Sequence, residues 1–483
     1  MDEPLHNIEE ADLNGDISDE VEDTLKVKKK RVNDNSQVSP EKLNRLDNIR
    51  ALPLKDRIFR KMDSGSLRGV VIMWIRMTLG IGILTLPFYV KQYGAITGVV
   101  MIALAAIVNF FAYTCIFDGS YLTQKKNYPD LIEALLGPTV LKVFRVTYMI
   151  DITSTVMIYC IISWNLLEYM IYFFNIGKEH WDEWIINTDK IQFNESHPVI
   201  FRIRAVFFGS MFLITIPLFL KRNLESLQKI TIAYLVALFI LVSIILIEVP
   251  FFRYAYRDQD IKMTWYKMPD YNWIECFLGL CISFYVQPFI FSLRGELLLP
   301  TIKRTKKIAK VSVIIETLLF CALGFLGYFA LGDVYTPNIF ILRKPYPGKN
   351  SYSEFTFRCA IGLFFILNSL GLAMYNPSLR DYIDPLFSMK NEKLKYIIVS
   401  LAPFLIICII AFVYPHVIDI TNFFGITIYN FNGYIIPILM RIQTLKINKE
   451  KFYKLALAYI ALFLFLSIGI AGLAFRFLGL IDI

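Results

Sequence analysis

Eleven apolar runs, each long enough to cross a lipid bilayer, constrain the fold of this chain more than any other feature. One helical span needs about 20 apolar residues. The runs lie at about 69–90, 94–118, 143–174, 199–220, 226–249, 272–293, 308–331, 356–377, 395–414, 417–440 and 455–479. Backbone groups in lipid must be bonded within the segment, and these runs do not alternate as barrel strands do. We therefore predict an all-α polytopic membrane protein with eleven transmembrane helices.

The composition excludes several other classes of protein. The chain is 56% hydrophobic and 19% charged, against roughly a quarter charged in an ordinary soluble domain. This balance rules out a disordered chain and argues against a soluble enzyme. The sequence shows no convergent nucleophile–base or His/Asp set, and its four histidines are too few and too scattered for a metal cluster. We expect no enzymatic activity, no cofactor and no metal.

The N-terminal residues differ sharply from the rest of the chain. Residues 1–25 contain ten acids and no Lys or Arg, and a run of basic residues follows at 26–31. A secretory signal would need a basic start and an apolar core, and a polar, charge-blocked segment with few aromatics is typical of disorder. We predict a disordered cytosolic tail at residues 1–65 and a transmembrane transporter domain at 66–483.

The distribution of Lys and Arg predicts the orientation in the membrane. Cytosolic connections are enriched in these residues, and here the even-numbered connections carry the excess, most clearly at 303–310. The N-terminus is therefore predicted to be cytosolic. The opposite side carries Asn194, followed by Glu and Ser, as a possible glycosylation acceptor. The net charge of +9 thus reflects topology, and the expected partner is the lipid bilayer and not a nucleic acid.

Two of the apolar runs contain residues that interrupt helices. The first run carries Gly80 and Gly82 in mid-span with Pro87 beyond them, and the sixth carries Gly279 and Pro288. Glycine lets a ligand approach the backbone closely, and proline removes a helical hydrogen bond. Transporters bind substrates where two helices in corresponding repeat positions are unwound near the bilayer midplane. The alternative is that the small residues only permit close helix packing.

The residues around the first break resemble the opening signature of the amino acid/auxin permease family. The matching stretches are Gly80–Pro87 (GIGILTLP) and Lys91–Gly94 (KQYG). The resemblance extends over about residues 66–480 but is specific mainly in span one. It implies a leucine-transporter-type 5+5 inverted repeat with broken helices 1 and 6, plus one extra helix. It also implies amino acid substrates and coupling to protons or sodium.

The resemblance also implies a set of substrate-binding residues. The backbone around the first break would hold the substrate carboxylate, the broken sixth helix would face its amino group and side chain, and spans three, eight and ten would complete the pocket. The candidates are, in that order, Thr78, Gly80, Ile81 and Gly82; Gly279, Cys281 and Ser283; and Tyr159, Ser369, Asn422 and Gly425.

Ionisable residues inside the spans are functional candidates because a charge at bilayer depth costs several kcal/mol. Arg76 stands where many sodium-coupled relatives have Asn, and a fixed guanidinium there would repel sodium. This favours proton coupling or sodium-independent exchange, unless Arg76 only snorkels to the surface. Asp151 and Glu316, at similar depths in spans three and seven, are candidate proton carriers or halves of a charge pair. Glu275 and Glu248 lie nearer the outer boundary and are expected to be solvated.

The sequence therefore predicts a secondary active transporter that moves amino acids by alternating access, with proton symport or sodium-independent exchange. The alternative is an amino acid sensor that signals through the N-terminal tail. The topology fits a plasma membrane or a vacuolar or lysosome-like membrane equally well.

Overall fold

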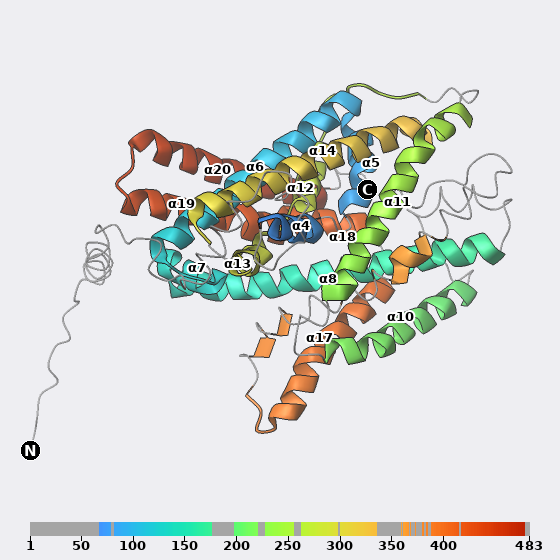
Figure 1. Ribbon diagram of the computed structural model, residues 1–483, viewed down its shortest axis with the longest axis horizontal. Helices are drawn as coiled ribbons and strands as arrows, with labels where there is room; N and C mark the ends of the chain where they lie inside the picture. Colours follow the sequence, from blue (N-terminus) through green and yellow to red (C-terminus); the bar gives the residue numbers. More distant parts are fainter. Residues whose placement is uncertain are drawn as a thin grey trace, which may run out of the picture.

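The computed structural model describes most of the predicted membrane domain. The described residues are 67–78, 82–175, 198–220, 228–255, 262–297, 300–335, 359, 361–366, 368, 372, 379–380, 383–384, 388–414 and 417–478. Within these ranges every regular element is a helix (Figure 1). The predicted tail at 1–65 lies outside them.

The helices follow the apolar runs closely. The α-helices are α4 (Leu67–Thr78), α5 (Gly82–Tyr93), α6 (Ala95–Thr123), α7 (Tyr128–Leu136), α8 (Pro138–Asn175), α10 (Pro198–Phe219), α11 (Gln228–Ala255), α12 (Asn272–Ser283), α13 (Ile290–Gly295), α14 (Ile302–Tyr335), α17 (Glu392–Val413), α18 (Val417–Phe424), α19 (Ile436–Ile447) and α20 (Phe452–Phe477). A 3₁₀ turn, η5 (Gln287–Phe289), and two π-helical segments, η9 (Gly425–Tyr429) and η10 (Phe431–Ile435), complete the described elements.

Seven spans in the described part of the chain are long and apolar enough to cross a membrane. The other four predicted spans are interrupted or partly described. The first is divided between α4 and α5, the fourth and fifth correspond to α10 and α11, and the eighth, at 356–377, falls largely outside the described residues. All-helical architecture is confirmed for the described residues, whereas the count of eleven stays a prediction.

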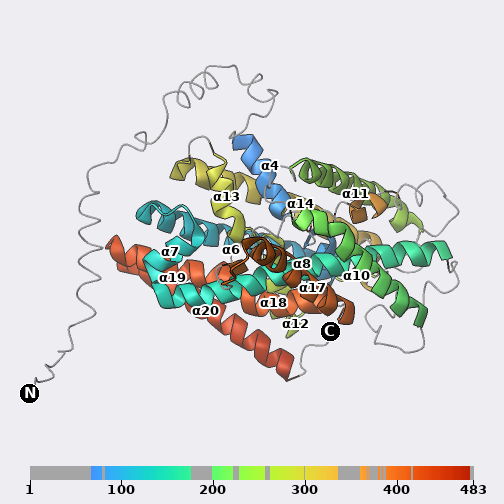
Figure 2. The ribbon, with the colours of Figure 1, turned by 90° about the horizontal axis from the view of Figure 1, so that it is seen from below.

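The helices form a bundle in which α14 packs against α4, α5, α6 and α11. Helix α8 crosses the length of the molecule, and α10 and α17 pack together beyond it (Figures 1 and 2). The centre of the bundle is occupied by α12, which contacts α5, α6, α18 and η9. Short helices with ends inside the protein thus lie at the middle, and long continuous helices surround them.

A segment following α11 fixes the junction between α5 and α6. The backbone N–H groups of Ala95 and Ile96 donate to the carbonyls of Thr264 (3.0 Å) and Trp265 (3.1 Å). These bonds satisfy amides that a helix N-terminus leaves unpaired. Gly94 makes the turn with φ +85°, and a Cβ there would lie 2.9 Å from the Tyr266 Cα, so glycine is required at this position.

The sixth span is broken where the glycine and proline predict. Helix α12 ends at Ser283, the backbone is non-helical at 284–286, and η5 and α13 follow. The exposed carbonyls of the break are satisfied by α6, because Asn109 Nδ2 donates to the Cys281 carbonyl (3.1 Å) and the Tyr113 hydroxyl donates to the Phe284 carbonyl. Buried backbone groups must find such partners, so the side chains of α6 stabilise the broken conformation.

The tenth span contains an interruption that the sequence does not predict. Between α18 and α19 the helix widens into η9 and η10, both largely buried. Asn430 lies between the two segments, and its Nδ2 donates to the Phe465 carbonyl on α20 (2.9 Å). π-helical turns recur at functional sites, and this one faces α12 and α8.

The expectation that Glu275 and Glu248 are solvated is wrong. Glu275 is 2% exposed and forms an ion pair with Arg476 of α20, and Glu248 is also buried. Both acids stand near the ends of their apolar runs, but helix α11 continues to Ala255 beyond Glu248, and Arg476 of α20 pairs with Glu275. Helix α20 is therefore bonded directly to α12, the first half of the broken sixth span.

Candidate functional site

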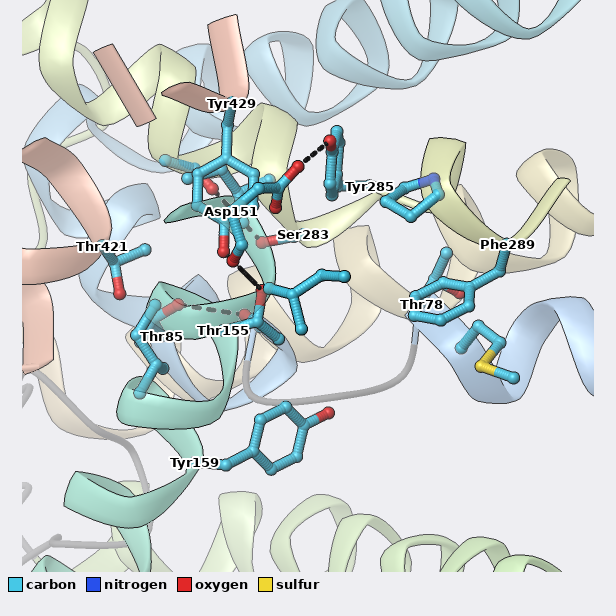
Figure 3. Close-up of a pocket in the computed structure, with 17 residues that line it drawn as sticks. Thr78, Thr85, Asp151, Thr155, Tyr159, Ser283, Tyr285, Phe289, Thr421 and Tyr429 are labelled. Atoms are coloured by element: carbon cyan, nitrogen blue, oxygen red, sulfur yellow. Dashed lines mark hydrogen bonds between the residues drawn. The ribbon is translucent and has the colours of Figure 1, made fainter. Parts of the chain in front are cut away.

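A central cavity lies where the two broken spans meet α8 and the tenth span. Its volume is about 90 Å³, measured as the space open to the centre of a water molecule, and one water needs only about 10–15 Å³ by that measure. Seventeen of the described residues line it (Figure 3). They come from α4, α5, α8, α12, η5, α18 and η9, and from the break itself. The cavity thus has room for more than a few ordered waters.

The ends of two half-helices meet at this cavity. A Cβ atom at position 82 would lie 2.5 Å from Ser283 Oγ and 2.8 Å from Ser283 Cα, so Gly82 allows the start of α5 to touch the end of α12. A helix N-terminus carries a partial positive charge and a C-terminus a partial negative charge. Opposite partial charges are therefore presented side by side, next to the open space.

The carboxyl group of Asp151 is a lining group supplied by α8. Its Oδ2 accepts hydrogen bonds from the Tyr285 hydroxyl (2.5 Å) and from Asn432 Nδ2 (3.2 Å). The Asn432 side chain is itself fixed, because its Oδ1 accepts from Thr147 Oγ1 (2.7 Å). Three elements, α8, the sixth-span break and η10, thus hold this carboxyl group in one position.

Aromatic and hydroxyl groups surround Asp151. The rings of Tyr285 and Tyr429 meet edge to face, with centroids 4.9 Å apart. The Tyr429 hydroxyl is 2.7 Å from Thr155 Oγ1, one turn after Asp151 on α8. Figure 3 shows Asp151 beside both tyrosines, with Thr155 next to them and Thr78 on the other side of the view. One wall of the cavity is therefore polar and aromatic.

Glu316 of α14 is buried behind the other wall. It is fully shielded from solvent, and its Oε1 accepts a hydrogen bond from Thr78 Oγ1 at 2.5 Å. Thr78 is the last residue of α4 and lines the cavity. Glu316 Oε2 is buried without a hydrogen-bond partner among the described residues, as is Ser312 Oγ one turn earlier. A single hydroxyl thus connects this carboxyl group to the first break.

The structure brings together six of the predicted site residues at the cavity and places four others behind it. The lining residues are Thr78, Gly82, Asp151, Tyr159, Gly279 and Ser283. Those buried nearby without lining it are Cys281, whose carbonyl bonds to Asn109; Asn422, whose Oδ1 accepts from the Tyr89 hydroxyl; Gly425 in η9; and Glu316.

The remaining predicted residues fall outside the described part of the chain. Gly80, Ile81, Ser369 and Asn194 lie outside the described residues, and Arg76 lies on α4 but its side chain is not described. The roles predicted for these residues, and for those at the cavity, stay predictions.

Several lining residues were not predicted from the sequence. Thr155 follows Asp151 by one helical turn, so helical spacing alone could have identified it. Tyr285 stands two residues after Ser283 in the non-helical segment, and both residues line the cavity while Phe284 between them does not. Tyr429 belongs to the π-helical segment, and no sequence signal placed it at the cavity.

The architecture is that of a known class of transporters. The chain shares its fold with MhsT, a transporter of the leucine-transporter fold whose crystal structure contains L-phenylalanine. The TM-score is 0.52 at 13% identity, over 85% of this chain and 100% of MhsT. This likeness supports the predicted fold type, and among the described residues the sixth span is broken as that fold type predicts.

The family follows from the sequence match. The model of the transmembrane amino acid transporter protein family matches residues 63–481, and the chain belongs to this family. It is an integral membrane protein, and the predicted family resemblance is confirmed.

Individual relatives are distant. The putative amino acid transporter AAT1 of Plasmodium falciparum is 22% identical over 59% of this chain and 43% of its own length. Vacuolar amino acid transporter 2 of Saccharomyces cerevisiae is 22% identical over 62% of this chain and 58% of its length. Amino acid transporter AVT6E of Arabidopsis thaliana is 22% identical over 86% and 83%. The match thus spans about half the length of the first two relatives.

Proposed function

We propose that this protein transports amino acids across a membrane by alternating access, with the central cavity as the substrate site. The observation that carries the proposal is the meeting of two broken spans at one cavity, with the start of α5 against the end of α12. Discontinuous helices at a repeat interface are the usual substrate site of such transporters. The names of the relatives, all amino acid transporters, support the same substrate.

The half-helix ends suit the part that all amino acids share. The α-carboxylate would bind at the start of α5 near Gly82, where free amides and the helix dipole favour an anion. The α-ammonium would bind near Ser283, at the carbonyl end of α12. Because these ends belong to two different half-helices, movement of one repeat against the other would open or close the site.

We further propose that the transporter is coupled to protons and that Glu316 carries the proton. Its Oε2 and the Oγ of Ser312, one helical turn earlier, are both buried without a hydrogen-bond partner among the described residues, and both are atoms that can receive a proton. A charged carboxylate with one hydrogen bond is costly to bury, whereas the protonated form is not. Arg76, one turn before the first break, would disfavour a sodium ion there.

Protonation of Glu316 would change the hydrogen bond of Thr78, the last residue of α4 before the first break. The unprotonated carboxylate accepts a hydrogen bond from the Thr78 hydroxyl group. When the proton is on Oε1, the carboxyl group can instead donate a hydrogen bond to Thr78 Oγ1, and the Thr78 hydroxyl can then donate to the Ile75 carbonyl 2.9 Å away. One proton thus reverses the bond that holds the end of α4, next to the substrate carboxylate.

The test is uptake of labelled amino acids into proteoliposomes that contain the full chain. An acidic exterior should increase uptake, and replacement of sodium by choline should leave it unchanged. If no amino acid is taken up, the transport proposal fails. If uptake requires sodium, proton coupling through Glu316 fails, while transport stands.

The membrane and the orientation are also proposals. A vacuolar or lysosome-like membrane is supported by the vacuolar relative from yeast, and the plasma membrane is the other option. A cytosolic N-terminus follows from the distribution of Lys and Arg. A protease-accessible tag at the N-terminus in sealed vesicles distinguishes the two orientations.

A further inference from the structure

We propose that the substrate is an amino acid with a cationic side chain, and that Asp151 binds its ammonium or guanidinium group. This inference rests on the proposed function, because it assumes that the central cavity is the substrate site. It adds the substrate class, which the fold and the half-helix ends leave open.

The first argument is the charge of the cavity. Among the seventeen described residues that line it, Asp151 is the only carboxylic acid, and none of these seventeen is Lys, Arg or His. Asp151 is 1% exposed and forms no ion pair with any described residue, and a buried charge without a partner is costly. A cavity of this kind is complementary to a ligand group with one positive charge.

The second argument is that the common part of an amino acid does not need Asp151. An amino acid zwitterion carries one negative and one positive group, and the ends of α5 and α12 present one site for each. Asp151 lies on α8, a different and continuous helix. Its charge is additional to the pair at the half-helix ends, and a cationic side chain supplies the third ligand charge that balances it.

The third argument is the geometry of the carboxyl group. Both hydrogen bonds from described residues, those of Tyr285 and Asn432, reach the same oxygen, Oδ2. No described hydrogen bond reaches Oδ1. The group is held rigidly by one oxygen, and the other is available to a donor in the cavity. Such preorganisation reduces the cost of binding.

The fourth argument is the aromatic surroundings. Tyr285 and Tyr429 line the cavity on either side of the Asp151 carboxyl group (Figure 3). An ammonium or guanidinium group is attracted to the faces of aromatic rings within about 6 Å. An acid flanked by two tyrosines therefore provides two kinds of attraction for a cation, and neither favours a neutral aliphatic side chain.

The test compares ligands of the same shape and different charge. Arginine and citrulline differ in the charged end of the side chain, as do lysine and norleucine. Each is used as a competitor of labelled arginine and labelled citrulline with the full chain in proteoliposomes. We expect wild type to bind arginine roughly tenfold or more tightly than citrulline, as desolvated charge pairs do.

The variant Asp151→Asn assigns the preference to this residue. It should reduce the arginine-to-citrulline ratio to near one. Glu133→Gln, on an exposed position of α7, makes the same chemical change far from the cavity and should keep the wild-type ratio. Thermal unfolding of both variants checks that they are folded.

The outcomes separate this inference from the proposed function. If wild type binds citrulline as well as arginine, or better, the cationic substrate is wrong while amino acid transport stands. If Asp151→Asn weakens both ligands equally, Asp151 holds the common α-ammonium group and the inference is overturned. If no amino acid binds wild type, the proposed function itself fails. The wild-type comparison decides the substrate class even if Asp151→Asn does not fold.

Discussion

Two buried carboxyl groups, on opposite sides of one cavity, have the same chemistry and different surroundings. Asp151 on α8 receives two hydrogen bonds on one oxygen and lines the cavity beside two tyrosines. Glu316 on α14 receives one hydrogen bond, has a second oxygen without a described partner, and does not line the cavity.

The difference indicates a division of roles. A rigid carboxylate that faces the ligand space is suited to recognise a charge in the ligand. A carboxyl group behind the wall, connected to the first break by the Thr78 hydroxyl, cannot touch the ligand but can change the break when it is protonated. The same acidic chemistry would thus serve selectivity in one place and coupling in the other.

The largest effect is expected from a substitution at Gly82, where the start of α5 touches the end of α12 beside the cavity. In Gly82→Val the new side chain would collide with Ser283, since even a Cβ lies 2.5 Å from its Oγ. We expect binding of arginine and citrulline to fall below detection in competition assays. Gly209→Val is the matched control, because nothing lies within 4 Å of that position. Retained affinity in a folded Gly82→Val protein would remove the first break from the site.

The next effect separates Glu316 from Asp151. Glu316→Gln removes the proposed proton carrier, so an acidic exterior should no longer increase uptake. The arginine-to-citrulline ratio should persist, because the Asp151 carboxyl group is untouched. Proteoliposome uptake with and without a pH gradient measures this. The proposed division of roles is wrong if Glu316→Gln loses the preference for arginine over citrulline. It is also wrong if uptake by Asp151→Asn no longer responds to the pH gradient.

A smaller effect is expected from the group that orients Asp151. Tyr285→Phe keeps the ring but removes the hydroxyl that donates to Oδ2 at 2.5 Å. A hydrogen bond to a charged group contributes about 1.5–3 kcal/mol, so we expect arginine affinity to fall by roughly tenfold and citrulline affinity to change less. An equal loss for both ligands would place Tyr285 at the common part of the substrate.

The smallest effect is expected at a carboxyl group outside the membrane spans. Lys454 donates a hydrogen bond to Glu450 at 2.8 Å, and that bond and its charge lower the pKa of Glu450 below its usual value. A lowered pKa means that any stabilisation is present at neutral pH and is lost as pH falls through the folded-state pKa. Exposed pairs contribute little, so Glu450→Gln should leave the thermal midpoint and uptake unchanged. A measurable fall in the thermal midpoint or in uptake would show that the Glu450–Lys454 pair contributes to stability or function.

The broken spans could be predicted because their signals are local. Pro288 acts on the backbone of its own segment, so the position of the break in the sixth span follows from the sequence. The π-helical turns at 425–435 could not be predicted in this way. They contain no proline, and their widened hydrogen bonding depends on packing against α12 and α20.

The two carboxyl groups show that the site, too, could be predicted only in part from the sequence. The cost of a buried charge identifies Asp151 and Glu316 as candidates, but which of them faces the cavity depends on the rotation of α8 and α14. Long helices that are apolar on all sides do not encode that rotation. Glu275 was placed wrongly for a related reason, since its partner Arg476 is 201 residues away in sequence.

The ion pair between Glu275 and Arg476 makes the structure sensitive to truncation near the end of α20. A premature stop codon just before position 476 would leave every described cavity residue present. It would also leave Glu275 buried without its cation, and breaking a buried pair costs about 3–5 kcal/mol. Such a truncation is therefore expected to destabilise the protein even though the cavity residues remain.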